Sequence, residues 1–316
     1  MLLNEFGLQR HPANPIIKPS DFPGADAVFN CGQTMWRDKT ILLVAVVLRH
    51  DPVPRMHVAE SLDGVRFTIR PEPFITRSTL PDIKPLDGWP IDPRITHMPE
   101  DDCYYIIRPG NSSWGCVSIL GRTRDWERYE DIAVVALPHN RVPCLFPEKI
   151  NGQYVRLDRP YTLVDDPHNH PQYGGIWISR SPDLIHWGQH KPLLAPWIHW
   201  NKVKIGPTPP IRTDAGWLVI LHGVGDSCSG QRYHIGAALL DINDPSIVIG
   251  KMNGYLMKAD RDYEYQGRVP NVVFPCGAIA DHAQDRLRIY YGAADTCIGL
   301  VTGRLSEIVS FCLEGR

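Results

Sequence analysis

Residues 58–69 read VAESLDGVRFTI, residues 120–130 read LGRTRDWERYE, and residues 177–188 read WISRSPDLIHWG. In all three segments a strand-like run is followed by a polar turn and then by a second strand-like run that contains an aromatic residue. Each segment carries a hydroxyl residue, an aspartate two positions later and then the aromatic residue: Ser61, Asp63 and Phe67; Thr123, Asp125 and Trp126; Ser181, Asp183 and Trp187. The chain therefore contains a repeat.

The repeat continues to the end of the chain and predicts its architecture. Equivalent segments follow around Asp244 and Ser306, so the units are spaced about 60 residues apart throughout. A four-stranded sheet with its turns needs about 40 to 60 residues, and a closed radial array of such sheets is a propeller. We therefore predict an all-β fold, a five-bladed β-propeller formed by residues 1–316 as a single domain. The competing fold, a β-sandwich with repeated hairpins, would not require a constant long period.

Local sequence also favours strands. The 29 prolines and 26 glycines separate short runs that are rich in Val, Ile, Tyr and Trp, such as TILLVAVVL at 40–48 and RLRIYYGAA at 286–294. Windows with the helical period of 3.6 are missing, apart from a short helix that we expect near LSEIVSFC at 305–312. In a propeller the inner strands point their loop ends at a central funnel, so polar residues far apart in sequence can converge there.

Charge and hydropathy indicate the kind of partner. The net charge is −2, from 33 basic and 35 acidic residues that are scattered along the chain. This distribution points to a small-molecule ligand and gives no sign of a nucleic-acid or membrane-surface partner. The start, MLLNEFGLQRHPANP, lacks the basic and apolar regions of a signal peptide, and no run approaches the roughly 18 apolar residues of a membrane span. We expect a cytoplasmic protein.

The eight cysteines do not form a metal-binding or disulfide pattern. They never occur as CxxC, and most lie within apolar strand-like runs. We interpret them as reduced thiols of the core, and we expect neither a zinc site nor a disulfide framework.

One carboxylate stands out in the segment WPIDPRIT at 89–96. Pro93 fixes its own φ and is expected to hold Asp92 in an extended conformation, while Ile91 and Ile95 are expected to be buried beside it. A carboxylate held in this way can have a shifted pKa and take part in catalysis. The alternative is that Asp92 and Arg94 form a turn-stabilising pair.

Other polar residues could line the same funnel. Arg141 and Arg159 lie at the edges of apolar segments, where CLFP and YVRL read as strands joined by an Asn151-Gly152 turn. A guanidinium group suits phosphate or carboxylate, although arginine at a strand end is by default a solvated surface residue. Further candidates at strand ends or bends are Lys204, His222, Asp295 and Asn30. A single histidine such as His222 is more often a core or rim residue than a base.

Eight segments in fixed order carry a family resemblance: WPIDPRI, NRVPCLFPEKINGQYVRLDRP, GGIWISRSPDLIHWGQHKPLL, KIGPTPPI, GWLVILHGV, YHIGAALLDINDPS, RVPNVVFPCGA and YYGAADT. Together they resemble the signatures of glycoside hydrolase family 130, over about Asn14 to Phe311. The resemblance implies a five-bladed propeller, in agreement with the repeat count. Most characterised members of that family are mannoside phosphorylases, which cleave a β-mannosidic bond with inorganic phosphate to give α-mannose 1-phosphate. Some are β-mannosidases that use water.

The resemblance also implies roles for individual residues. Asp92 matches the general acid of the family's Asp-Pro-Arg motif. The phosphate-binding set that it implies is Arg141, Arg159, Lys204 and His222, with Tyr233 near the phosphate. The substrate-binding set is Asn30 and Asp295, to which we add Cys31, Arg49 and Arg94. Cys31 stands where the family usually has serine or a small residue, and Arg49 is displaced by several residues from the family's arginine.

This set suits inverting phosphorolysis. Inversion needs an acid on one face of the sugar and a nucleophile on the other. Phosphate is already an anion, so it needs cations that position it and no second carboxylate to activate it. We expect no cofactor other than phosphate as co-substrate, and no metal. A homo-oligomer is one option, because propellers of this family commonly associate.

Two alternatives remain. A hydrolytic β-mannosidase of the same fold would need a carboxylate base about 6.5 to 9.5 Å from the acid. A sugar-binding propeller without catalysis is suggested by Cys31 and by the displaced arginine.

Overall fold

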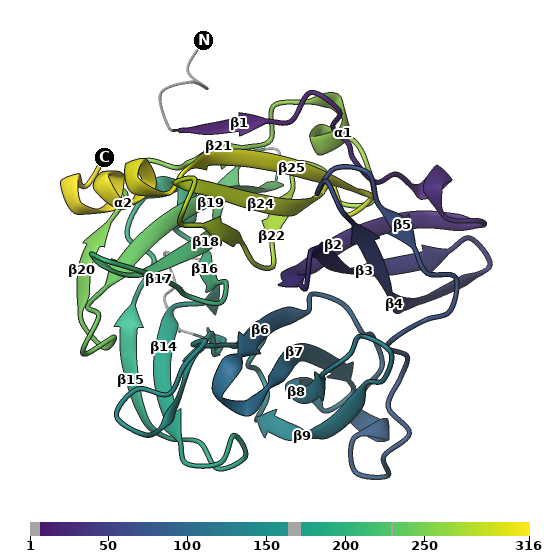
Figure 1. Cartoon of the computed structure of the whole chain (residues 1–316), viewed down its shortest axis with the longest axis horizontal. Coiled ribbons are helices and arrows are strands. Elements are labelled where there is room, and N and C mark those ends of the chain that lie inside the picture. Colours follow the sequence, from purple (N-terminus) through teal and green to yellow (C-terminus); the bar gives the residue numbers. More distant parts are fainter. Residues whose placement is uncertain (1–6, 164–171, 229) are drawn as a thin grey trace.

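Five antiparallel sheets surround a central axis in this computed structural model, which describes residues 7–163, 172–228 and 230–316 (Figure 1). The first sheet contains β2 (Ala25–Trp36), β3 (Lys39–Leu48), β4 (Asp51–Ser61) and β5 (Thr68–Ile69). The second contains β6 (Arg94–Met98), β7 (Cys103–Ser112), β8 (Gly115–Thr123) and β9 (Glu130–Ala136). The third contains β10 (Cys144–Leu145), β11 (Tyr154–Asp158), β14 (Ile176–Ser181) and β15 (Gly188–Leu194).

The last two sheets carry additional short strands. The fourth contains β16 (Lys204–Pro207), β18 (Gly216–Ser227), β19 (Gly230–Leu240) and β20 (Val248–Lys251), with β17 (Ile211–Thr213) and β21 (Met257–Lys258) at its sides. The fifth contains β22 (Val273–Pro275), β24 (Arg286–Ala293), β25 (Cys297–Arg304) and β1 (Leu8–Arg10), with β23 (Ile279–Asp281) beside β24. A separate ladder joins β12 (Thr162–Leu163) to β13 (Gln172–Tyr173). The predicted five-bladed β-propeller is confirmed.

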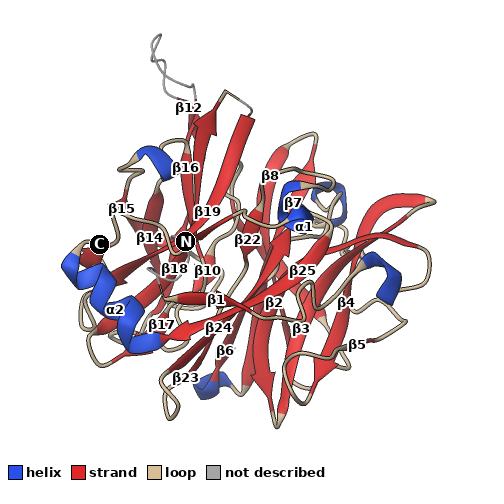
Figure 2. Cartoon of the chain, turned by 90° about the horizontal axis from the view of Figure 1, so that it is seen from above, coloured by secondary structure: helices blue, strands red, loops and turns tan. Residues whose placement is uncertain are grey.

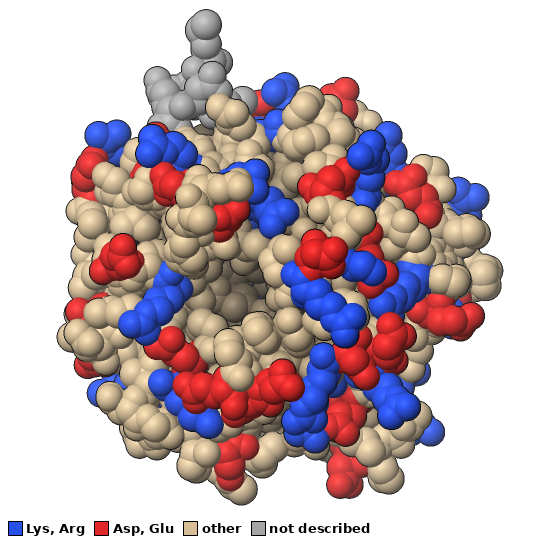
Figure 3. Space-filling model, in the orientation of Figure 1, with Lys and Arg blue, Asp and Glu red and all other residues tan. Residues whose placement is uncertain are grey.

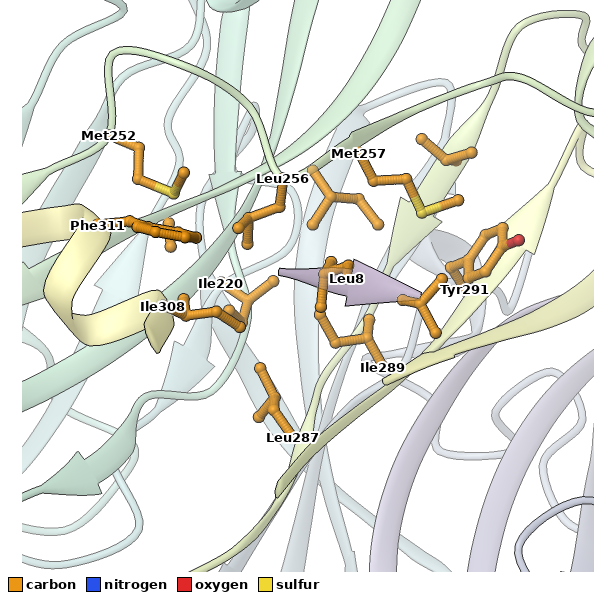
Figure 4. Close-up of a cluster of buried hydrophobic side chains, with 14 of the residues drawn as sticks. Leu8, Ile220, Met252, Leu256, Met257, Leu287, Ile289, Tyr291, Ile308 and Phe311 are labelled. Carbon is orange, nitrogen blue, oxygen red and sulfur yellow. The ribbon is translucent and has the colours of Figure 1, made fainter. Parts of the chain in front are cut away.

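The fifth blade is closed by the beginning of the chain. β1 pairs antiparallel with β25, so that Leu8 lies opposite Gly303. The repeat around Ser306 is not a strand, turn and strand, because Ser306 lies in α2 (Leu305–Glu314), the short helix expected from the sequence. Figure 2 shows α2 at the outer edge of the molecule. Its apolar face packs with β1, β24 and the fourth sheet in a core cluster (Figure 4). The only other α-helix of the described residues is the single turn α1 (Asp262–Tyr265).

The repeated aspartates stabilise the turns between the third and fourth strands. In the first blade, Asp63 Oδ1 accepts hydrogen bonds from the backbone N–H groups of Val65 and Arg66, both at 2.8 Å. Asp125 and Asp183 make the same pair of bonds in the next two blades. In the fourth blade the equivalent residue is Asp241 rather than Asp244. An aspartate at this position fixes the turn, which explains why the repeat is readable.

The inner strands β2, β6, β10, β16 and β22 line the axis. The surface is hollowed at this hub, and acidic and basic side chains are interspersed around it (Figure 3). Of the eight cysteines, all free, only Cys228 is exposed. No helix within the described ranges is long and apolar enough to cross a bilayer. Residues 1–6, part of the start considered above, lie outside those ranges.

Candidate active site

A cavity of about 370 Å³ at the hub brings together side chains from all five blades. Eight residues predicted from the sequence line it: Asn30, Asp92, Arg141, Arg159, Lys204, His222, Tyr233 and Asp295. Asn30 lies on β2 and Asp92 precedes β6, while Arg141 and Arg159 flank the β10–β11 hairpin. The fourth blade supplies three residues and the turn between β24 and β25 supplies Asp295. The convergence expected of a propeller therefore occurs.

Asp92 is held on one wall of this cavity. Its side chain is buried, and the residue is only 4% exposed. The Asn30 side-chain amide donates to Asp92 Oδ1 at 2.8 Å, and Arg141 Nη2 lies 3.6 Å from Asp92 Oδ2. Ile91 and Ile95 are buried on either side of it, as expected. These contacts fix the direction of the carboxylate.

The predicted extended conformation of Asp92 is wrong, because its φ is +54°. Pro93 does not decide this angle; the contacts of the carboxylate hold the residue in the left-handed region. Three other residues that line the cavity share this conformation: Asn30 (φ +42°), Val142 (φ +67°) and Asp295 (φ +48°). Non-glycine residues rarely adopt such angles unless the surroundings impose them. Four of the thirteen non-glycine residues with positive φ in the described ranges therefore line this cavity.

Two glycines make room for functional side chains. A Cβ atom at Gly292 would lie 2.0 Å from Asn30 Oδ1, so any side chain there would displace the residue that holds Asp92. A Cβ atom at Gly206 would lie 2.1 Å from Cε1 of His222. Because neither glycine has a side chain, Asn30 can lie against the backbone of the fifth blade and His222 against that of the fourth.

The same cavity carries an excess of positive charge. Burial and the nearby Arg141 lower the pKa of Arg159 to about 10. Burial, together with Arg159 and Arg141, lowers the pKa of Lys204 to about 8. Burial alone would also lower the pKa of Arg141, but Asp92 raises it on balance. Buried cations that lower one another's pKa lack sufficient negative charge nearby. A multivalent anion bound in the cavity would supply that charge.

His222 and Tyr233 lie near these cations. Burial and the neighbouring Arg159 hold the pKa of His222 well below its usual value, so the imidazole is neutral. Burial raises the pKa of Tyr233 to about 12, so its hydroxyl keeps its proton. The two rings lie 6.2 Å apart. Both side chains can therefore donate a hydrogen bond to an anion without adding charge.

A second carboxyl group faces the cavity from the fifth blade. Burial and the nearby Asp92 raise the pKa of Asp295 to about 7. At neutral pH this group therefore carries a proton about half of the time, and it can donate as well as accept a hydrogen bond. That property suits the hydroxyl groups of a sugar.

Three residues predicted to bind substrate do not line the cavity. Cys31 is 0% exposed and points into the core of the first blade, because a bulge between Phe29 and Gly32 turns only Asn30 inward. Arg49 is exposed at the turn between β3 and β4. Arg94 is 1% exposed, with its guanidinium 5.2 Å from the ring of Phe274. Arg94 does not pair with Asp92, so the turn-stabilising alternative is also not observed.

Several lining residues were missed from the sequence: Cys116, His139, Val142, Tyr161, Val269, Val272 and Phe274. His139 and Tyr161 lie two positions from Arg141 and Arg159, and the last three belong to the RVPNVVFP segment, so proximity to the motifs was the available signal. No group of three or more His, Cys, Asp or Glu side chains in the described ranges is placed to hold a metal ion.

Comparisons with known proteins agree with this geometry. A family sequence model described as beta-1,4-mannooligosaccharide phosphorylase matches residues 8–314. The chain is 32% identical to the beta-1,4-mannooligosaccharide phosphorylase of Ruminococcus albus, over 96% of this chain and 90% of that protein. It is 31% identical to the 4-O-beta-D-mannosyl-D-glucose phosphorylase of Bacteroides fragilis, over 92% and 76%.

A solved structure gives the same result. The beta-1,2-mannobiose phosphorylase of Listeria innocua, in complex with beta-1,2-mannobiose, superposes with a TM-score of 0.84 at 29% identity, over 96% of this chain and 99% of that one. The relatives differ in the mannosidic linkage that their names give, at similar identities. The family signatures, the propeller and the hub cavity agree, and the chain belongs to glycoside hydrolase family 130, the family of β-mannoside phosphorylases.

Proposed function

We propose that this protein cleaves the β-mannosidic bond of a short manno-oligosaccharide or a mannosyl-glucose disaccharide by inverting phosphorolysis and releases α-mannose 1-phosphate. Asp92 is the general acid that protonates the departing glycosidic oxygen. Phosphate binds to a basic cluster formed by Arg141, Arg159, Lys204 and His222, with Tyr233 beside it. Asn30 and Asp295 bind the mannose.

The observation that carries this proposal is the presence of a buried acid and a surplus of cations in one cavity. Asp92 lines it together with Arg159 and Lys204, whose pKa values are lowered by burial and by neighbouring cations. Inverting phosphorolysis needs a proton donor on one face of the sugar and an anionic nucleophile on the opposite face. Fixed cations offset the lost hydration of phosphate and orient its attacking oxygen. The names of the relatives support the same reaction.

A hydrolytic β-mannosidase is the second candidate, because Asp295 is a further carboxyl group in the cavity. Such an enzyme would use Asp295 or another base to activate water, and it would turn over mannosides without phosphate. The surplus of cations has no role in that reaction.

The test incubates the purified protein with β-1,2-mannobiose, β-1,4-mannobiose and mannosyl-β-1,4-glucose, each with and without inorganic phosphate. Phosphorus NMR would detect α-mannose 1-phosphate, and sugar analysis would detect free mannose. We expect turnover of at least one substrate only when phosphate is present. Equal turnover in both conditions would support the hydrolase, and saturable sugar binding without turnover would support the non-catalytic propeller.

A further inference from the structure

A second cavity of about 590 Å³ lies beside the first, between the second and third blades. Its lining includes two tryptophans, Trp177 and Trp187, and the polar side chains of Asn140, Asp158 and His190. We propose that this inter-blade groove binds the sugar units of a manno-oligosaccharide that lie beyond the bond being cleaved. This inference rests on the proposed function, because it extends the same substrate out of the hub cavity.

The two cavities share a wall whose residues face alternately one way and the other. Arg141 and Arg159 line the hub cavity, while their neighbours Asn140 and Asp158 line the groove. Asn140 Nδ2 donates to Asp158 Oδ1 at 2.8 Å, and Asn140 Oδ1 accepts from the backbone N–H of Arg159 at 3.0 Å. This wall is therefore fixed by hydrogen bonds on its groove side.

Two residues belong to the lining of both cavities. His139 and Tyr161 line the hub cavity and the groove, so the two cavities lie next to each other at these side chains. The hub cavity is at the small end of the roughly 300 to 1,000 Å³ that ligand pockets span. It must hold phosphate and one mannose during the proposed reaction, so the remaining units of a longer chain must leave it. The groove adjoins the hub cavity at His139 and Tyr161, and we infer that these units enter it there.

The third blade presents an unusual face to this groove. On β14, Ile176 and Ile178 pack into the core against the fourth blade, so Trp177 and Ser179 face the other way. Trp177 is partly exposed, and its indole makes no hydrogen bond or ring contact with another described residue. Leu137, on the opposite rim, is 83% exposed. Within the described ranges, this indole lines the groove without a partner, so it is a candidate contact for a ligand.

The charges in the groove are balanced, which selects the class of ligand. Arg156 Nε lies 2.9 Å from Asp158 Oδ1, and Ser179 Oγ donates to Asp158 Oδ2 at 2.5 Å. The ring of Trp187 lies 4.0 Å from the Arg156 guanidinium. Because these charges neutralise each other, the groove does not attract an anion as the hub cavity does. Tryptophan faces with a few fixed polar groups suit the C–H faces and hydroxyls of a neutral sugar.

The test compares substrates of different length in wild type and in two variants of Trp177. We expect wild type to have a higher kcat/KM for mannotetraose than for mannobiose of the linkage it cleaves. In Trp177→Ala the ratio of these two values should fall about tenfold, a loss typical of truncating a tryptophan that packs on a ligand. Trp177→Phe should restore most of the ratio. Trp36→Ala, a partly buried tryptophan at the far end of β2 that lines neither cavity, is the matched control.

Direct titration separates this inference from the proposed reaction. Mannotetraose, added without phosphate, should bind wild type and the control about tenfold more tightly than it binds Trp177→Ala, whether or not the sugar is turned over. Equal affinities in wild type and Trp177→Ala, or equal ratios in the kinetic comparison, would overturn the groove proposal. A wild type that forms no mannose 1-phosphate but shows the length-dependent binding would overturn the proposed function alone.

Discussion

Replacing Lys204 by methionine should stabilise the protein when phosphate is absent. The pKa of Lys204 falls from 10.5 to about 8 because the side chain is buried and because Arg159 and Arg141 lie nearby. The folded state therefore disfavours the charged form relative to the unfolded state. At pH 7 the difference corresponds to roughly 3 kcal/mol, at about 1.4 kcal/mol per pH unit. Methionine keeps an apolar chain of similar length beside Tyr233, whose ring lies 5.5 Å from Lys204 Nζ.

The size of this effect depends on pH. A cation with a lowered folded-state pKa destabilises the fold fully below that value, and the penalty disappears as pH rises through the unfolded-state value. The gain in Lys204→Met should therefore be largest below about pH 8 and should vanish near pH 10.5. For a chain of this size, 3 kcal/mol corresponds to a rise in Tm of about 5 °C.

Thermal melts in phosphate-free buffer at pH 7 and pH 10 would measure the effect. Added phosphate should then raise the Tm of wild type strongly, because it binds only the folded state, and should raise that of Lys204→Met much less. Lys202→Met, a change at an exposed lysine two positions earlier, is the matched control and should behave as wild type. A variant that melts below wild type at pH 7 without phosphate would refute the reasoning, as would equal stabilisation of both by phosphate.

Three further predictions concern the same cavity. Asp92→Asn should lower kcat by about 10² to 10⁴-fold in product assays while phosphate still raises Tm, because only the proton donor is lost. Gly292→Ala should lower kcat/KM for the mannoside at least tenfold, because the new Cβ displaces Asn30; an unchanged value would contradict this. Initial rates should show that kcat/KM for phosphate falls up to tenfold per pH unit above about pH 8, because Lys204 of the phosphate-free enzyme loses its proton there.

The architecture could be predicted because its signal is local and repeated. Asp63, Asp125 and Asp183 each fix a turn by accepting two backbone N–H bonds, and such a turn needs the same residue in every blade. The last blade departs from the pattern because its outer strand, β1, comes from the other end of the chain. No local pattern indicates a pairing between residues nearly 300 positions apart, so the unit around Ser306 was wrongly read as a fifth turn.

The residue types of the cavity could be predicted from the sequence, but the directions in which the side chains point could not. Family motifs place Asn30 and Cys31 together, but the bulge in β2 that turns one inward and the other into the core is set by pairing with β3. The left-handed backbone of Asp92 was missed for a similar reason, because the side-chain contacts of its carboxylate override the preference imposed by Pro93. The groove has no sequence signal at all, because it arises where two blades meet.

The positions of the two carboxyl groups bear on the choice between phosphate and water. An inverting hydrolase needs its base across the sugar from its acid, about 6.5 to 9.5 Å away. Here the Asn30 side-chain amide donates to Asp92 Oδ1 at 2.8 Å, and burial together with the nearby Asp92 raises the pKa of Asp295 to about 7. The same cavity holds Arg159 and Lys204, which can position phosphate but cannot activate water as a carboxylate base would.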